Sequence, residues 1–152
     1  STKLILEIKK HATPQRETQV VEAILRLARE MRLVPQIEFI SFSRHACDEV
    51  LRLQPDAVVV YVSSDMAAMS PAEAKKRGYG GLSYQLNVLM NRPELVDEAN
   101  RLGIATTLWM VNDCELIDWA ARHGITYVST DCPDKAEAYL EAVAAYKNKN
   151  KK

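Results

Sequence analysis

Apolar and polar residues alternate in the stretch LILEIKKH, residues 4–11, and this alternation predicts a strand. Leu4, Leu6 and Ile8 alternate with the other residues, so one face of the predicted strand is apolar. Glu7 and Lys9 share the opposite face, because residues two apart in a strand point the same way and lie about 7 Å apart along it. If this face were covered by other elements, burying the two charges would cost free energy, and we would expect them there only for a functional reason. The role of this pair therefore depends on the fold of the whole chain.

Six segments have strand patterns, and helical patterns separate them. The segment 81–85 is open to a second interpretation as part of a loop. The predicted strands are 4–9, 37–42, 57–62, 81–85, 104–111 and 125–130. The predicted helices are 17–31, 44–54, 71–76, 93–103, 113–124 and 133–146.

The ends and faces of these helices have local signals. Gly103 and Gly124 are predicted to follow the last turns of their helices, since glycine readily adopts the left-handed conformation found there. Ser70 is expected to cap the short helix, and Pro133 suits a first helical turn. The helix over 17–31 places apolar residues at helical spacing: Val20, Ala23, Ile24, Leu27 and Met31.

Alternation of strands and helices predicts an α/β protein with a mostly parallel sheet. Two architectures fit: an open, doubly wound, flavodoxin-like sheet, or part of a (β/α)8 barrel. The length of 152 residues favours the open sheet, because a complete barrel needs about 250 residues. No linker divides the chain, so we expect a single α/β domain over residues 1–146 and a solvated basic tail over 147–152.

Polar and aromatic side chains at the strand ends favour the barrel, since catalytic groups gather at the carboxyl ends of barrel strands. Some of these side chains also have a purely structural interpretation: Asn112 or Asp113 could cap the following helix, and Trp109 could belong to the core. The residues concerned are Glu7 with Lys9, Ser41 with Phe42, Trp109 with Asn112, and Thr130 with Asp131.

Composition narrows the possible partners. Twenty basic residues balance twenty acidic ones, so no global field favours nucleic acid or an anionic membrane. The longest apolar runs, such as 57–62, are too short to span a bilayer. Three cysteines form no CxxC pair, so neither a zinc site nor a disulfide framework is indicated, and the cellular compartment stays open.

Five short motifs carry a resemblance to a known family. They are EIK at 7–9, ISF at 40–42, YGGLSYQ at 79–85, LWMVN at 108–112 and STDCP at 129–133. In this order they resemble the later motifs of the glycerophosphodiester phosphodiesterase family, over about residues 3 to 135. The resemblance implies a barrel fold and metal-dependent hydrolysis of a small glycerophosphodiester to glycerol phosphate and an alcohol.

The resemblance also implies roles for individual residues. Glu7 would be a carboxylate ligand of Ca²⁺ or Mg²⁺, which prefer oxygen donors. Lys9 would be a catalytic residue that offsets charge developing on the phosphate. Trp109 would form the floor of the substrate pocket beside the glycerol, with Phe42 nearby.

Two departures from the family pattern stand out. Met110 takes the place of the usual threonine, a mild change if the side chain faces the helices. The family's His-Arg-Gly, Glu-x-Asp and His-Asp blocks, which would supply the acid, the base and two metal carboxylates, are not in these residues. His11 and His45 follow strands and are the candidates to replace them, whereas His123 is expected at a helix C-terminus.

A partial barrel has open sheet edges that need a cover. We expect the chain to be a piece of a longer enzyme, covered by a second copy or by a complementing N-terminal barrel segment. The sequence thus supports two hypotheses: a metal-dependent phosphodiesterase, or a catalytically silent structural or assembly module that self-associates. A small phosphate-binding α/β module is less consistent, because no glycine-rich phosphate loop follows a strand.

Overall fold

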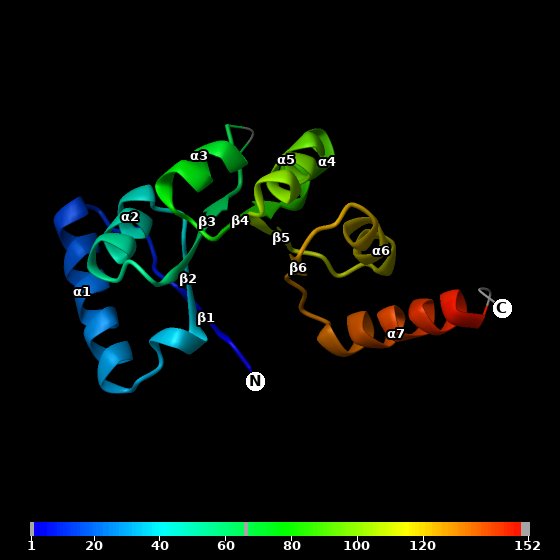
Figure 1. The fold of residues 1–152 in the computed structure, drawn as a ribbon, viewed down its shortest axis with the longest axis horizontal. Helices are drawn as coiled ribbons and strands as arrows, with labels where there is room; N and C mark the ends of the chain where they lie inside the picture. The colour runs from blue at the N-terminus through cyan, green and yellow to red at the C-terminus, as the bar shows by residue number, and fades with distance from the viewer. Residues whose placement is uncertain (1, 66, 150–152) are drawn as a thin grey trace.

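The computed structural model describes residues 2–65 and 67–149 as one sheet with flanking helices (Figure 1). The strands are β1 (Leu4–Glu7), β2 (Ile37–Ser41), β3 (Val58–Ser63), β4 (Gly81–Gln85), β5 (Ala105–Trp109) and β6 (Tyr127–Val128). The helices are α1 (Pro14–Glu30), α2 (Arg44–Leu53), α3 (Pro71–Arg77), α4 (Leu86–Asn91), α5 (Glu94–Leu102), α6 (Cys114–Arg122) and α7 (Pro133–Lys149), with a 3₁₀ turn, η1 (Val34–Gln36).

The predicted strands and helices are confirmed, and 81–85 is a strand, not a loop. The sequence pattern does not predict α4, because this helix follows β4 directly and Gln85 makes no capping hydrogen bond with its side chain. Helix α7 extends to Lys149, so it includes the first half of the predicted tail 147–152; residues 150–152 lie outside the described residues.

Helix α3 shows why local sequence sets these boundaries. The Ser70 hydroxyl accepts a hydrogen bond from the amide of Glu73, and Pro71 occupies the first helical position, where no amide hydrogen is needed. Gly78 ends the helix with φ +80°, a conformation that costs glycine little.

All six strands are parallel, and their order in the sheet is β1-β2-β3-β4-β5-β6. Each crossover therefore proceeds in the same direction. Right-handed crossovers of this kind place all the helices on one face, and Figure 1 shows them as an arch around the sheet. A doubly wound sheet reverses direction, so the flavodoxin-like alternative is wrong and the fold is a partial (β/α)8 barrel.

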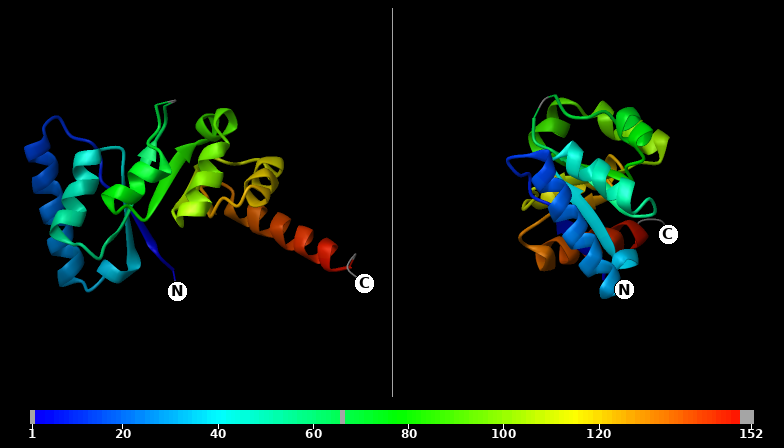
Figure 2. Two further views of the ribbon diagram at one scale, coloured as in Figure 1. Left: turned by 45° about the horizontal axis from the view of Figure 1, so that its top comes forward. Right: turned by 90° about the vertical axis from the view of Figure 1, so that its left-hand side faces the viewer.

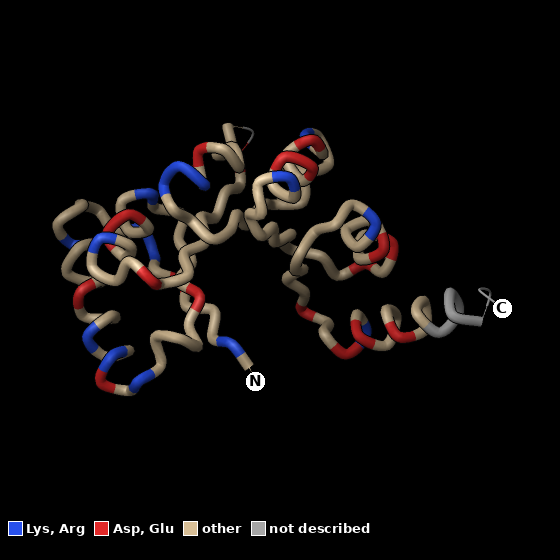
Figure 3. Tube along the Cα trace, in the orientation of Figure 1, with Lys and Arg blue, Asp and Glu red and all other residues tan. Residues whose placement is uncertain are grey.

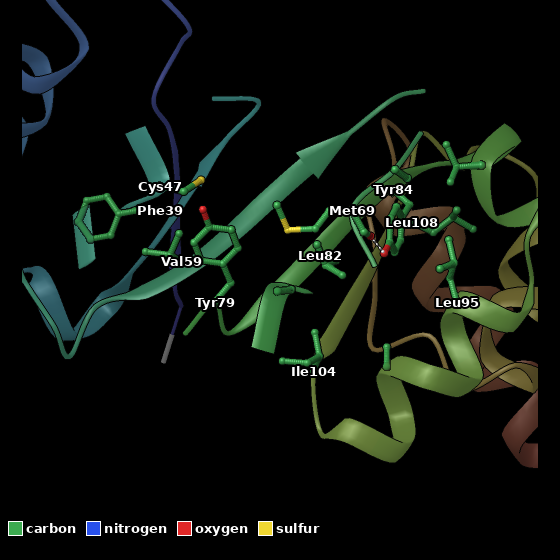
Figure 4. Packing of buried hydrophobic residues seen from close by; sticks show 14 of the residues in the cluster. Phe39, Cys47, Val59, Met69, Tyr79, Leu82, Tyr84, Leu95, Ile104 and Leu108 are labelled. Atoms are coloured by element: carbon green, nitrogen blue, oxygen red, sulfur yellow. Dashed lines mark hydrogen bonds between the residues drawn. The ribbon is translucent and has the colours of Figure 1, made fainter. Parts of the chain in front are cut away.

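The hydrophobic core lies between the sheet and the arch of helices (Figure 4). Phe39, Leu82 and Leu108 of three different strands are each at most 1% exposed and point toward the helices. Tyr84 is also buried in this layer, where its hydroxyl donates to the Met69 carbonyl at 2.6 Å. Full burial of each large apolar side chain contributes about 1.5–3 kcal/mol.

Helix α1 packs with a different face from the one that spacing alone favours. Its buried residues are Glu17, Val21, Leu25 and Ala28, whereas Leu27 and Met31 from the predicted apolar set are more than half exposed. Both sets satisfy helical periodicity. Packing against α2 and the sheet selects the set that includes a carboxylate.

None of the helices in residues 2–65 and 67–149 lies on the concave face of the sheet. Ile5, Val58 and Tyr127 are 59%, 41% and 51% exposed there. The sheet is curled enough that one cavity of about 260 Å³ is lined by residues from all six strands or their immediate flanks, from Lys3 and Ile5 to Tyr127.

Charged residues lie mostly on the helices, with both signs interspersed (Figure 3). This distribution is consistent with the balanced net charge, since neither positive nor negative residues dominate the surface. Among the described residues, no helix combines the length and the apolarity needed to cross a membrane.

The core and the surface of this fold should respond differently to the same substitution. Leu82→Ala should lower the free energy of unfolding by about 2–5 kcal/mol, because Leu82 is fully buried. Leu27→Ala is the matched control and should change it by about 0.5 kcal/mol or less, since Leu27 is 56% exposed. Urea denaturation measures both; equal losses would contradict this description of the core.

Candidate active site at the carboxyl ends of the strands

The residues singled out in the sequence lie at one edge of the sheet. Glu7 and Trp109 are the last residues of β1 and β5, and Phe42 directly follows β2. The strands run in one direction, so their carboxyl ends share this edge (Figure 2). It is the edge at which α/β barrels carry their chemistry.

Glu7 and Lys9 share the concave face, as the alternation predicts. Glu7 is paired in register with Ile40 of the concave face, whereas Leu6 is paired with Phe39 of the core. The Lys9 Nζ atom lies 2.8 Å from Glu7 Oε1, with the side chains 74% and 29% exposed respectively. The pair is therefore at an open rim and not in a sealed interior, where it would be far more costly.

Two polar atoms at this edge are buried and make no hydrogen bond with the described residues: Glu7 Oε1 and Trp109 Nε1. The Lys9 ammonium contacts the Glu7 oxygen, but not in hydrogen-bonding alignment. Buried polar atoms in proteins are usually paired, and leaving one unpaired costs about 1–3 kcal/mol. At this rim Trp109 Nε1 is thus a donor without a partner among the described residues, and Glu7 Oε1 is engaged by the Lys9 ion pair alone.

Phe42 and Trp109 form an aromatic pair across the rim. Their ring centroids are 5.9 Å apart and the rings are nearly perpendicular, at 86°. Such edge-to-face pairs contribute about 0.5–1.5 kcal/mol beyond their buried area. The rings come from the ends of β2 and β5, and the curl of the sheet brings these ends together.

The described residues do not fit a complete metal site. Glu7 offers a carboxylate oxygen without a hydrogen bond, which suits a hard cation. Residues 2–65 and 67–149, however, contain no group of three His, Cys, Asp or Glu side chains that could hold a metal ion. One protein ligand is too few for Ca²⁺, which takes six to eight oxygens.

The three histidines have different surroundings. His45 Nε2 lies 3.0 Å from the Thr18 hydroxyl, so its ring is engaged beneath the rim. His11 is half-buried in the loop after β1, and its backbone amide donates to Glu17. His123 ends α6, where its ring stacks on Trp119, in agreement with the expected place at a helix C-terminus.

Asn112 joins the ends of β5 and β6. Its side-chain oxygen accepts from the Asp131 amide at 2.8 Å, and its side-chain nitrogen donates to the Asp131 carboxylate at 2.9 Å. The cap of α6 is Asp113, which accepts from the amide of Glu115. Asn112 is therefore a brace between two strand ends rather than a helix cap.

The sequence patterns do not reveal the buried Glu17, which is 3% exposed. Burial acts to raise its pKa, but hydrogen bonds from Ser43 and from the His11 amide, with the charges of His45 and Lys10, outweigh burial and lower the pKa. One signal was available: Glu17 lies four residues before Val21 and eight before Leu25, on the stripe that is buried.

The geometry defines a class of protein: a partial α/β barrel with a charged pair and an aromatic pair at the carboxyl edge of its sheet. The model of the glycerophosphoryl diester phosphodiesterase family matches residues 3–135, and the chain belongs to this family. The resemblance carried by the five short motifs is thereby confirmed.

The chain is similar to proteins considerably longer than itself. It is 32% identical to a glycerophosphodiester phosphodiesterase from Parabacteroides distasonis, whose crystal structure superposes with a TM-score of 0.88 over 93% of this chain and 58% of that chain. It is 28% identical over 101 residues to the Mycobacterium tuberculosis "Probable glycerophosphodiester phosphodiesterase 1", covering 66% of this chain and 37% of that protein.

A more distant solved structure supports the fold alone. A phosphodiesterase from Oleispira antarctica, in complex with the product sn-glycerol-3-phosphate, is 18% identical with a TM-score of 0.75, covering 88% of this chain and 53% of that chain.

Glu17 should make the folded chain acid-sensitive. Its pKa is lowered from the ordinary value of 4.5, so the unfolded chain binds the proton more tightly than the folded chain. Its contribution to stability is thus complete above that value and is lost as the pH falls below it, through the folded pKa. Between about pH 5 and 3, the free energy of unfolding should fall more steeply for the wild type than for Glu17→Gln. Urea denaturation across this pH range measures the free energy of unfolding of both proteins. If the two free energies fell in parallel with pH, the prediction would be wrong.

Proposed function

We propose that the chain carries the phosphate- and glycerol-binding part of a glycerophosphodiester phosphodiesterase. The observation that supports this most directly is the rim itself, where Glu7 Oε1, 2.8 Å from Lys9 Nζ, has no hydrogen-bond partner among the described residues. Family membership over residues 3–135 supports the same substrate class. The proposed reaction is hydrolysis of a small glycerophosphodiester to glycerol phosphate and an alcohol.

Lys9 is the proposed catalytic residue. Its ammonium is 74% exposed at the rim, so it is free to approach an anionic phosphate. A positive charge at this point stabilises negative charge that develops on the phosphate oxygens as the ester bond breaks. An ammonium is suited to this as a point charge with three donors.

Phe42 and Trp109 are the proposed substrate-binding residues. The perpendicular pair offers an apolar wall to the carbon skeleton of glycerol. The unpartnered Trp109 Nε1–H is available to donate to a hydroxyl or phosphate oxygen. A wall with one polar donor is the usual composition of a small-molecule site.

A divalent cation, Ca²⁺ or Mg²⁺, remains a proposal for the assembled site. Glu7 would supply one carboxylate oxygen, and the cation would add positive charge near the phosphate. Because the described residues contain no group of three such ligands, we propose that further ligands come from outside them.

The cover of the open barrel is also a proposal. β1 and β6 each have one unpaired edge in the described sheet, and the concave residues Ile5 and Tyr127 are more than half exposed. A (β/α)8 barrel has eight strands, so a parallel segment with two strands would pair with both edges and cover this face. We infer that this segment also brings the acid, the base and the remaining metal ligands.

A catalytically silent assembly module is the second candidate. It is favoured by the lack, within the described parts of the chain, of a three-residue metal group. In that module a second copy of the chain would cover the open edges. Sedimentation of the purified chain distinguishes the two: a module that self-associates sediments as an oligomer, whereas a chain awaiting a different segment sediments as a monomer.

Ligand binding tests the proposed site without requiring turnover. Addition of sn-glycerol 3-phosphate to the purified chain should change the fluorescence of Trp109 in a saturable way. The change should persist in Trp119→Phe and vanish in Trp109→Phe. A signal that depends on Trp119 instead would place binding elsewhere and contradict the proposal.

Hydrolysis tests the proposed reaction. Turnover of a simple glycerophosphodiester is measured with the chain alone and with a complementing N-terminal barrel segment added, in each case with Ca²⁺, with Mg²⁺ and with chelator. Glu7→Gln and Lys9→Gln should each lower kcat/KM by roughly a hundredfold or more, since each removes a charge from the site. Glu22→Gln, on the exposed face of α1, is the matched control and should leave turnover unchanged. No turnover even with the complementing segment present would favour the silent module.

A further inference from the structure

A cluster of buried polar side chains lies beneath the rim, between β1 and β2. Glu17, Ser41 and Ser43 are 3%, 2% and 6% exposed. They belong to three different parts of the chain: the first turn of α1, the end of β2 and the cap of α2.

Each oxygen of the Glu17 carboxylate binds a different loop. Oε1 accepts from the His11 backbone amide at 3.0 Å, and Oε2 accepts from the Ser43 hydroxyl at 2.6 Å. His11 is two residues beyond Lys9, and Ser43 is one residue beyond Phe42. The carboxylate therefore joins the loop of the proposed catalytic lysine to the loop of the proposed aromatic wall.

The surrounding hydrogen bonds leave no easy substitute for this carboxylate. The Ser43 hydroxyl accepts from the Ala46 amide at 3.2 Å, so its single hydrogen is the one that it donates to Glu17. A glutamine at position 17 would replace one of the two carboxylate oxygens with an NH₂ group, so one of the two donors would face a donor in place of its acceptor. The Ser41 hydroxyl adds a second link, donating to the Ile8 carbonyl at 2.7 Å and accepting from the Ser43 amide.

Packing alone does not explain why position 17 has a charged residue. Glu17 continues the buried stripe of Val21 and Leu25, where an apolar side chain would avoid the cost of desolvating a carboxylate. The charge is instead held by two hydrogen bonds that both end at loops of the rim. Phe42, next to Ser43, in turn contacts Trp109.

We propose that Glu17 is a positioning residue: its carboxylate ties the loop after Lys9 to the loop after Phe42 and so holds Phe42 against Trp109. The inference rests on the proposed function for the roles of Lys9, Phe42 and Trp109. The tie between the two loops is a property of the chain itself and is measurable without turnover.

The test is ¹H–¹⁵N NMR spectroscopy of the full chain. The chain has two tryptophans, so it gives two indole N–H signals, and Trp119→Phe identifies the one from Trp109. In Glu17→Gln, exchange of the His11 amide should become at least about tenfold faster, because a hydrogen bond to a charged group is lost. The Trp109 indole signal should shift, and that of Trp119, which stacks on His123 in α6, should not.

Two further variants complete the design. Glu22→Gln, also in α1 but exposed, should leave His11 and both indole signals unchanged. Ser43→Gly removes the donor hydroxyl at a position where glycine is a tolerated cap, and it provides the test if Glu17→Gln does not fold. It should shift the Trp109 indole signal in the same direction as Glu17→Gln.

The outcomes separate this inference from the proposed function. If the His11 amide changes and the Trp109 indole signal does not, Glu17 is a structural anchor only and the inference is overturned. If both change while sn-glycerol 3-phosphate does not bind the wild type, the positioning stands and the proposed function fails. If the wild type binds, Glu17→Gln should weaken binding, and an unaltered Kd would overturn the inference.

Discussion

The structure depends on one constraint: the six strands are parallel, and each pairs beside the strand that precedes it in the chain. Each new strand pairs beside the previous one, and the twist between neighbours accumulates into a curl. All right-handed crossovers then place their helices on the convex side. This gives the sheet a covered face, which holds Phe39, Leu82 and Leu108, and a concave face without helices.

The candidate site is a consequence of the same geometry. Parallel strands bring their carboxyl ends to one edge, and the curl turns that edge into a rim across which β2 and β5 meet. The Phe42–Trp109 contact exists only because of that curl. Glu7 and Lys9 sit where a charged pair is tolerated, on the concave side but partly in solvent.

The polar contacts of this chain differ in how much they contribute to stability. The pair of Arg52 with Glu49 is exposed on one side, and such surface pairs contribute about 1 kcal/mol or less. The hydrogen bonds of Glu17 are buried and involve a charge, so each contributes about 1.5–3 kcal/mol. The loops that carry the candidate residues Lys9 and Phe42 are therefore joined by a contact whose loss would lower the free energy of unfolding.

The sequence by itself determined the features that depend on near neighbours. Period-two alternation placed Glu7 and Lys9 on one face, and Ser70, Pro71 and Gly78 set the limits of α3. Motif order along the chain predicted the family, and the match over residues 3–135 confirms it. These features require only backbone sterics and hydrogen bonds between residues a few positions apart.

Strand order, the buried face of α1 and the contacts between distant residues were decided only by the tertiary structure. The pattern of strands and helices is the same in a doubly wound sheet and in a barrel, because strand order is a matter of long-range pairing. Two apolar stripes of α1 satisfy helical spacing, and contact with α2 and the sheet selected the one that buries Glu17. The pairing of Phe42 with Trp109 and the brace of Asn112 on Asp131 join residues far apart in sequence. Periodicity says which side of an element a residue faces, but the curvature and packing of the whole sheet decide what it meets there.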